Sequence, residues 1–165
     1  MTLAEANEKN RADFVWALGW IFEDSPWVAE RAWASRPFAT VKALHEVMLE
    51  VVQHASGEEQ LALLRAHPDL GTRTRVSTAS AGEQKGAGLD SLAPDEFEGL
   101  QALNRQYREK FGFPFIYAVK GSGREDVLLA LTLRLDGTPE EELHQALWEV
   151  GRIAWFRLEQ MFEES

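Results

Sequence analysis

The chain has the length and composition of one acidic globular domain, spanning residues 1–165, with 45% hydrophobic residues, 27% charged residues and a formal net charge of -10. This charge makes nucleic acid and anionic membrane surfaces poor partners, because binding to either needs clustered lysine and arginine. The absence of cysteine excludes disulfides and cysteine metal sites, and the lack of a long apolar stretch or an apolar targeting core leads us to expect a cytoplasmic protein with no membrane partner.

Apolar residues recur at helical spacing from the start of the chain. Phe14, Leu18 and Ile21 lie on one face of a predicted helix. Ser25 and Pro26 are expected to cap and open the next helix, because serine is favoured at the N-cap and proline at the first helical position. Helices of modest length are therefore expected to follow one another here.

The middle of the chain continues this helical pattern. A helix from about Val41 to His54 places Leu44, Met48 and Val51 on one apolar face. Ser56 is expected to cap the following helix, in the sequence GEEQLALLRA.

A longer helix is predicted from Pro94 to Phe111, with Asp and Glu in its first turn and Gly112 as its stop. The segment Phe113–Val119 is the one run with extended character, because Pro114 disfavours helix in the residue before it and β-branched or aromatic residues follow. It has no evident pairing partner.

The last part of the chain predicts two more helices. Leucine spacing over Leu128–Leu135 indicates one that closes near Gly137, and Thr138 with Pro139 starts a final helix reaching about Phe162. The predicted fold is therefore all-α, a compact single-domain bundle of about seven to nine helices.

Candidate chemistry is concentrated between Arg65 and Asp90. His67 is followed by Pro68, which should end the preceding helix and display the imidazole at its C-terminus, where the helix dipole favours a protonated, acid-competent form. An ordinary polar turn residue is the alternative for His67, and Asp69 is interpreted as a turn former.

Ser80, Glu83 and Gln84 have the spacing of residues that share one side of a helical turn. They could form a small polar recognition face. The alternative is a capping box with Ser80 as the cap and Glu83 as its partner, which needs no ligand. The glycines that follow lack the lysine and serine of a phosphate-binding loop.

No metal site is expected, because the histidines have no metal-binding spacing and His45, His54 and His144 lie within helical patterns. Arg157 could hold an anionic group, although a surface salt bridge is the simpler interpretation. The tryptophans are expected in the core or at a subunit interface; they are Trp16, Trp20, Trp27, Trp33, Trp148 and Trp155.

Several motifs together resemble one family over nearly the whole chain, from about Phe14 to Leu158. They are FEDSPWVAERAW, RPF, LLRAHPDLG, SxxEQ followed by GAGLD, LNRQYREKFGFPFI and the closing RL. In this order and spacing they resemble the OHCU decarboxylases, the 2-oxo-4-hydroxy-4-carboxy-5-ureidoimidazoline decarboxylases of urate degradation. The resemblance implies an all-helical homodimer, a carboxy-lyase that forms (S)-allantoin without metal or organic cofactor.

The resemblance also implies a set of site residues. The family's catalytic histidine falls on His67 and its acidic partner on Glu83. The positions of its substrate contacts are Pro68, Ser80, Gln84, Phe115, Ile116, Tyr117, Ala118, Val119 and, as a late arginine, Arg157.

Two other functions remain open from the residues alone. One is a helical protein-interaction module whose acidic surface and tryptophans bind a partner, with His67 and Glu83 purely structural. The other is an acid/base lyase or hydrolase acting on a related heterocycle. A buried polar pocket that joins His67, Glu83 and residues 115–119 would argue against the interaction module.

Overall fold

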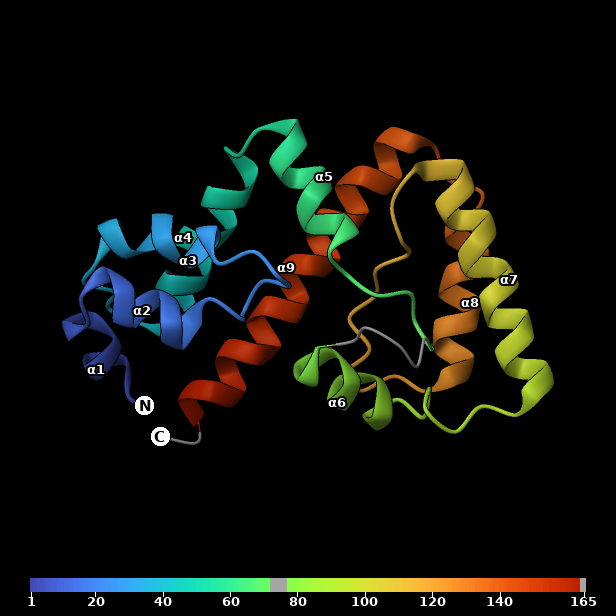
Figure 1. Ribbon diagram of the computed structural model, residues 1–165, viewed down its shortest axis with the longest axis horizontal. Coiled ribbons are helices and arrows are strands. Elements are labelled where there is room, and N and C mark those ends of the chain that lie inside the picture. Colours follow the sequence, from blue (N-terminus) through green and yellow to red (C-terminus); the bar gives the residue numbers. More distant parts are fainter. Residues whose placement is uncertain (72–76, 164–165) are drawn as a thin grey trace. The chain divides into compact units, whose positions relative to one another are not determined.

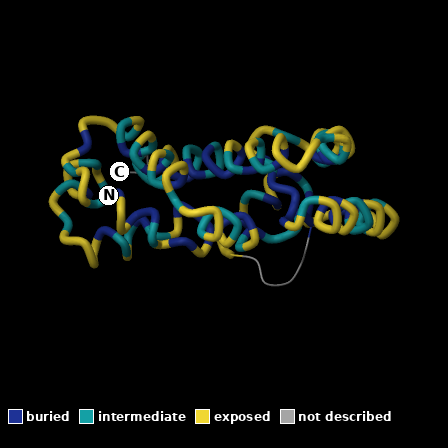
Figure 2. Tube along the Cα trace, turned by 90° about the horizontal axis from the view of Figure 1, so that it is seen from above, coloured by how far each residue is buried: buried dark blue, intermediate teal, exposed yellow. Residues whose placement is uncertain are grey.

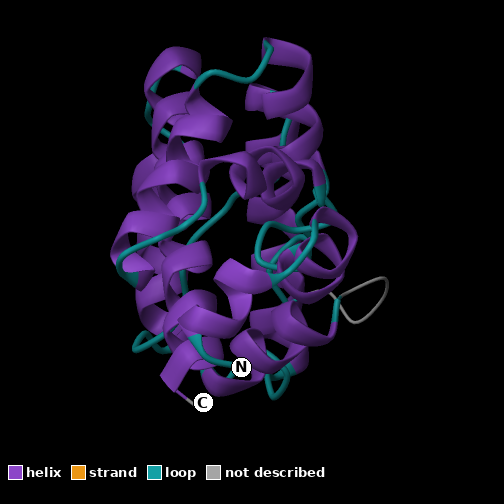
Figure 3. Ribbon diagram, turned by 90° about the vertical axis from the view of Figure 1, so that its left-hand side faces the viewer, coloured by secondary structure: helices purple, strands orange, loops and turns teal. Residues whose placement is uncertain are grey.

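The computed structural model describes residues 1–71 and 77–163, and all regular secondary structure in them is helical (Figures 1 and 3). The helices are α1 (Leu3–Glu8), α2 (Arg11–Leu18), α3 (Trp27–Ala32), the short 3-10 helix η1 (Trp33–Ser35), α4 (Val41–Gln53), α5 (Gly57–Arg65), α6 (Thr78–Gly86), α7 (Pro94–Phe111), α8 (Arg124–Arg134) and α9 (Pro139–Glu163). The all-α prediction is confirmed, and the nine α-helices of the described residues fall within the predicted number. Residues 72–76 of the Arg65 to Asp90 stretch lie outside the described residues.

The chain forms two compact units. The first contains Met1–Ala66 and Gly151–Ser165, and the second contains His67–Val150, so that the boundary falls inside α9. None of the described helices has the length and apolar character needed to cross a membrane. A single domain over residues 1–165 stays a prediction.

In the first unit, α3 packs against α2 and α4. Phe14, Leu18 and Ile21 are all buried, but α2 ends at Leu18, so Ile21 lies beyond the helix whose face it was predicted to share. In α4 the buried face is Leu44, Met48 and Val52, whereas the predicted Val51 is only half-buried. The steps of four residues keep these three side chains on one side of the helix. Figure 2 shows the same amphipathic alternation of buried and exposed residues along the helices.

Two serine N-caps were predicted in this unit, and one of the two predictions is correct. Ser56 caps α5 as expected, with a reciprocal capping box to Glu59. Ser25 does not cap α3, which begins at Trp27, one residue later than predicted. Its hydroxyl instead donates to the Glu23 carbonyl at 2.8 Å, so it is committed to the preceding turn.

In the second unit, α7 packs against α8 and ends at Gly112, whose φ of 82° lies in the left-handed region. Residues 114–119 form neither helix nor strand, as predicted for an unpaired segment. α9 starts as predicted, with the Thr138 hydroxyl accepting from the Glu141 amide at 3.2 Å. α8 ends at Arg134, slightly before the predicted closure near Gly137.

An aromatic cluster joins α7 to the segment that follows it. The Tyr107 ring lies 4.6 Å from the Phe111 centroid, 6.0 Å from that of Phe113 and 5.4 Å from that of Phe115. Tyr107 and Phe115 are fully buried. Aromatic burial of this kind contributes strongly to stability, so the cluster fixes the start of the extended segment against α7.

The tryptophans do not form the core. None of the six is fully buried, and Trp16 and Trp148 are 88% and 55% exposed. The core interpretation is therefore wrong for these residues, while a subunit interface stays a prediction.

Candidate active site

His67 lies just beyond the capped end of α5, as the sequence predicted. Ala66 is the C-cap, with its amide donating to the Ala62 carbonyl at 3.0 Å, and Pro68 follows the histidine. The His67 side chain is only 6% exposed. The imidazole is therefore a buried group that follows the C-terminal end of α5.

The loop that carries His67 is tied to two helices of the second unit. The Gly71 amide donates to Gln84 Oε1 on α6 at 2.8 Å, and Asn104 Nδ2 on α7 donates to the Leu70 carbonyl at 2.9 Å. Both hydrogen bonds are buried, so breaking either one leaves a polar group unsatisfied. They hold the backbone of the loop at a fixed distance from α6 and α7.

Two further features of the loop explain its sequence, HPDLG. Gly71 has φ +80°, and an added Cβ would come within 2.7 Å of Leu100 Cδ2, so no larger residue fits without a shift. Asp69 does more than form a turn, because its Oδ1 pairs with Arg108 Nη2 at 2.8 Å. Asp69, Leu70 and Gly71 of this motif thus each have a structural contact with α6 or α7.

Helix α6 presents the predicted polar face but uses a different cap. Ser77 is the N-cap, accepting from the Ser80 amide at 3.1 Å, so the capping role predicted for Ser80 is wrong. Ser80 and Gln84 are buried and Glu83 is half-buried. Gln84 Nε2 makes no hydrogen bond with any residue that the structure describes, which leaves it as a donor for a ligand.

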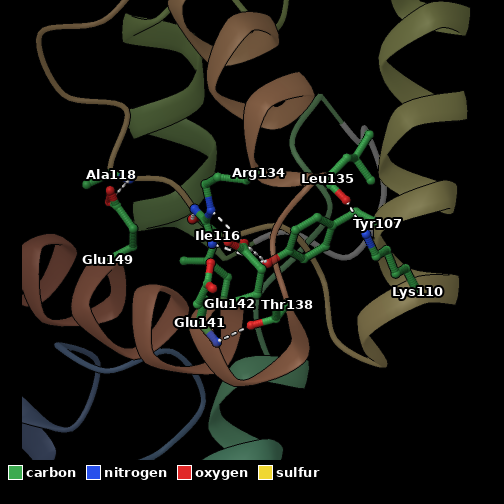
Figure 4. A network of polar contacts seen from close by, with 10 residues as sticks. All are labelled: Tyr107, Lys110, Ile116, Ala118, Arg134, Leu135, Thr138, Glu141, Glu142 and Glu149. Carbon is green, nitrogen blue, oxygen red and sulfur yellow. Dashed lines mark hydrogen bonds and ion pairs between the residues drawn. The ribbon is translucent and has the colours of Figure 1, made fainter.

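The segment from Phe115 to Val119 is held by a half-buried side chain of α8 and a buried side chain of α9 (Figure 4). Arg134 Nη1 donates to the Ile116 carbonyl at 2.6 Å, and the Ala118 amide donates to Glu149 Oε2 at 3.2 Å. The Ala118 amide is therefore already hydrogen-bonded within the protein, and a substrate contact for this residue stays a prediction.

Glu149 was not among the site residues predicted from the sequence, although the sequence of α9 contains a signal for it. Glu142 and Glu149 are 4% and 2% exposed, on the same side of α9 as the buried Ala146 and Val150. An acidic residue on the apolar face of a helix needs a buried partner, and this requirement points to a polar network.

One face of α7 contacts both the His67 loop and the start of the segment at residues 115–119. Asn104 contacts the His67 loop, and Tyr107, three residues later, packs its ring against Phe115. Residues three apart on a helix are neighbours on its surface. The His67 loop and the start of the extended segment therefore lie on the same side of α7.

Arg157 lies in the first unit and is not a surface residue, so the interpretation as a surface salt bridge is wrong. It is 3% exposed, and its Nη2 pairs with Glu23 Oε2 at 2.9 Å. Its Nη1 donates to the carbonyls of Trp20 and Ile21 at 3.2 and 3.3 Å. A substrate contact for Arg157 stays a prediction.

The described residues contain no group of three or more histidine, aspartate or glutamate side chains arranged to hold a metal ion. Helix α6, to which the His67 loop is bonded through Gln84, carries a carboxylate, an amide and a hydroxyl. Such groups can donate and accept hydrogen bonds with a small polar molecule and can exchange protons with it.

Comparisons with known proteins agree over nearly the whole chain. A family model described as OHCU decarboxylase matches residues 7–159. The 2-oxo-4-hydroxy-4-carboxy-5-ureidoimidazoline decarboxylase of Haloferax volcanii is 48% identical over 165 residues, which are 100% of this chain and 98% of the relative. The uric acid degradation bifunctional protein of Bacillus sp. (strain TB-90) is 43% identical over all of this chain, which spans 33% of that protein. A crystal structure of (S)-allantoin synthase superimposes with a TM-score of 0.78 at 35% identity, covering 98% of this chain and 54% of the other.

Proposed function

Because this chain belongs to the OHCU decarboxylase family, we propose that it converts 2-oxo-4-hydroxy-4-carboxy-5-ureidoimidazoline to (S)-allantoin, with His67 and Glu83 as its acid/base pair. The reaction class is that of a carboxy-lyase in urate degradation. The observation that carries the assignment of the site is the buried His67 in a loop whose backbone is bonded to α6, the helix of Glu83.

The substrate itself supplies the place for the electrons that decarboxylation releases. Its carboxylate is on a carbon that bears a hydroxyl and adjoins a C=N bond. When the C–C bond to the carboxylate breaks, CO2 leaves and the electron pair forms a C=C bond to the ureido-bearing carbon. The π pair of the C=N bond moves to its nitrogen, which takes a proton from water, and the product of this step is an enol. The protein therefore needs groups that orient the substrate and move protons, and the buried loop and α6 carry such groups.

His67 is proposed to protonate the intermediate. The enol becomes the carbonyl by giving its hydroxyl proton to water, as the ureido-bearing carbon takes a proton from the imidazolium on one face only, which gives the S product. His67 follows the capped end of α5, and this role requires its imidazolium form as the donor.

The polar face of α6 is proposed to orient the substrate. Glu83 holds the imidazole or the ureido group in place, and Gln84 Nε2 donates to a substrate carbonyl, because its Oε1 is occupied by the Gly71 amide. Ser80, Pro68 and Arg157 complete the proposed contacts.

A homodimer and a cytoplasmic location belong to the same proposal. Exposed aromatic side chains are enriched at subunit interfaces, and Trp16 and Trp148 are strongly exposed in one copy of the chain. Light scattering after size-exclusion chromatography measures the mass directly. A monomer at micromolar concentration would contradict the dimer, and fractionation of cells expressing the protein would test the location.

The function is tested by generating the unstable substrate in place, from urate with urate oxidase and the hydrolase that follows it. Circular dichroism then follows the optical activity of the product. We expect (S)-allantoin to appear faster than in the reaction without this protein. An unchanged rate, or a racemic product, would contradict the proposal, whereas CO2 release alone would not discriminate because the substrate also decays spontaneously.

A further inference from the structure

Side chains of α8 and α9 hold two backbone groups of the segment at residues 115–119 (Figure 4). Its Ile116 carbonyl accepts from Arg134 and its Ala118 amide donates to Glu149. Two residues apart, these groups lie on the same edge of an extended chain, because both polar groups of a residue point to one side and those of the next residue to the other.

The side chains confirm this two-residue period. The rings of Phe115 and Tyr117 are stacked with centroids 6.1 Å apart and planes at 9°, as expected for residues i and i+2 of an extended chain. The opposite edge therefore carries the polar groups of Tyr117 and the amide of Val119. Neither of these two amides donates a hydrogen bond within the part of the chain that the structure describes.

Arg134 is itself held rigidly by three groups. Its Nε donates to Glu142 Oε1 at 2.8 Å, its Nη2 donates to the Tyr107 hydroxyl at 3.2 Å, and its guanidinium lies 4.6 Å from the centre of the Phe115 ring. The Tyr107 hydroxyl in turn donates to Glu142 Oε1 at 2.6 Å. Burial and the bond to Glu142 raise the pKa of the Tyr107 phenol, so the hydroxyl remains a donor.

We propose that Arg134 and Glu149 are positioning residues that fasten the Ile116 and Ala118 edge and so present the amides of Tyr117 and Val119 to the substrate. Two such amides are about 7 Å apart, which suits two separate oxygens of one small polar ligand better than a single oxyanion. The carboxylate or ring carbonyl and the ureido carbonyl of the proposed substrate are such a pair. This inference rests on the proposed function for the identity of the ligand.

The first test uses wild-type protein labelled with 15N and the product (S)-allantoin as the probe. We expect the amide resonances of Tyr117 and Val119 to move on titration more than those of Ile116 and Ala118. The opposite order would overturn the proposal. No variant is needed for this measurement, so it does not depend on how well a substituted network folds.

The second test measures the fastening without any ligand. The Ala118 amide should exchange its hydrogen slowly in the wild type and at least about tenfold faster in Glu149→Ala, because it loses its buried acceptor. Equal exchange rates in the two proteins would show that Glu149 does not hold this edge. This result stands even if the wild type fails to accelerate (S)-allantoin formation, which would reject the proposed function instead.

The third test separates positioning from chemistry in the kinetics. Arg134→Met should raise KM by at least about tenfold, with the pH profile of kcat unchanged, and Arg134→Lys should recover part of the loss because one charged donor remains. The matched control is Arg124→Met on the same helix, whose ion pair with Glu96 is about one third exposed and lies outside the site. A loss of the same size in the control, or wild-type kinetics in Arg134→Met, would contradict the role of Arg134.

Discussion

His67 combines burial with a backbone fixed by hydrogen bonds on its C-terminal side, which suits a proton donor more than a turn residue. General acid catalysis typically contributes about 100-fold to 10,000-fold, so His67→Ala should lower kcat by at least the smaller factor. Its melting temperature should stay near that of the wild type, since the loop is held through Leu70 and Gly71. Full stereospecific turnover by this variant would show that another group donates the proton.

Glu83 is tested by a change of charge with little change of shape. Ser77 and not Ser80 caps α6, so Glu83 is not needed as the capping-box partner that the sequence allowed. We therefore expect Glu83→Gln to slow (S)-allantoin formation at least about tenfold without lowering helix stability. Unchanged kinetics combined with a lower melting temperature would return Glu83 to a structural role.

At the scale of elements, helix ends with a strong local signal were predictable and those with competing signals were not. Ser56 was predicted as the cap of α5 and Gly112 as the stop of α7, and both act as predicted. Ser77 and Ser80 both have side chains able to cap a helix, and the Ser77 hydroxyl is the one that accepts from the amide three residues later. Ser25 fits the N-cap preference, but the carbonyl of Glu23 competes for its hydroxyl.

The polar network around the extended segment was missed for a different reason. Arg134 is 18 residues from Ile116, and Glu149 is 31 residues from Ala118. Side-chain contacts at such separations depend on how helices pack, which local periodicity does not contain. The segment's extended character followed from Pro114 and its β-branched neighbours, whereas its partners needed the tertiary structure.

The loop between α5 and α6 should depend on Gly71 more than on any other glycine of this region. Alanine there combines a left-handed φ with a Cβ 2.7 Å from Leu100, and we expect a loss of about 1 to 3 kcal/mol in the free energy of unfolding, with reduced turnover. The control is Gly99→Ala, where the added Cβ meets nothing within 4 Å inside α7, so stability should rise by up to about 1 kcal/mol. Urea unfolding measures both, and equal effects would contradict the argument.

At the scale of the whole molecule, composition and charge made nucleic acid and membrane surfaces poor partners but did not identify the reaction. A net charge of -10 and the absence of cysteine fit many acidic enzymes and binding proteins. The ordered set of motifs from Phe14 to Leu158 was what pointed to one family, and the family match over residues 7–159 agrees with it.

The stability of the folded chain should fall on mild acidification because of His45. Burial lowers the pKa of this imidazole below its ordinary 6.5, outweighing its hydrogen bond to the Gly151 carbonyl and the charge of Glu46. Between the folded-state pKa and 6.5 the unfolded chain binds more protons, so this group's contribution is complete above pH 6.5 and is lost as pH falls through the folded-state value.

Replacing His45 by glutamine removes the proton site and keeps a side-chain donor for the Gly151 carbonyl, which His45 Nε2 reaches at 2.8 Å. We expect the free energy of unfolding of His45→Gln, measured by urea at steps from pH 7.5 to 5.5, to decline less steeply than that of the wild type. The comparison of slopes cancels the other titrating groups, because both proteins share them. Parallel curves would mean that the burial of His45 does not couple protonation to unfolding, and that the contact between α4 and α9 tolerates the imidazolium.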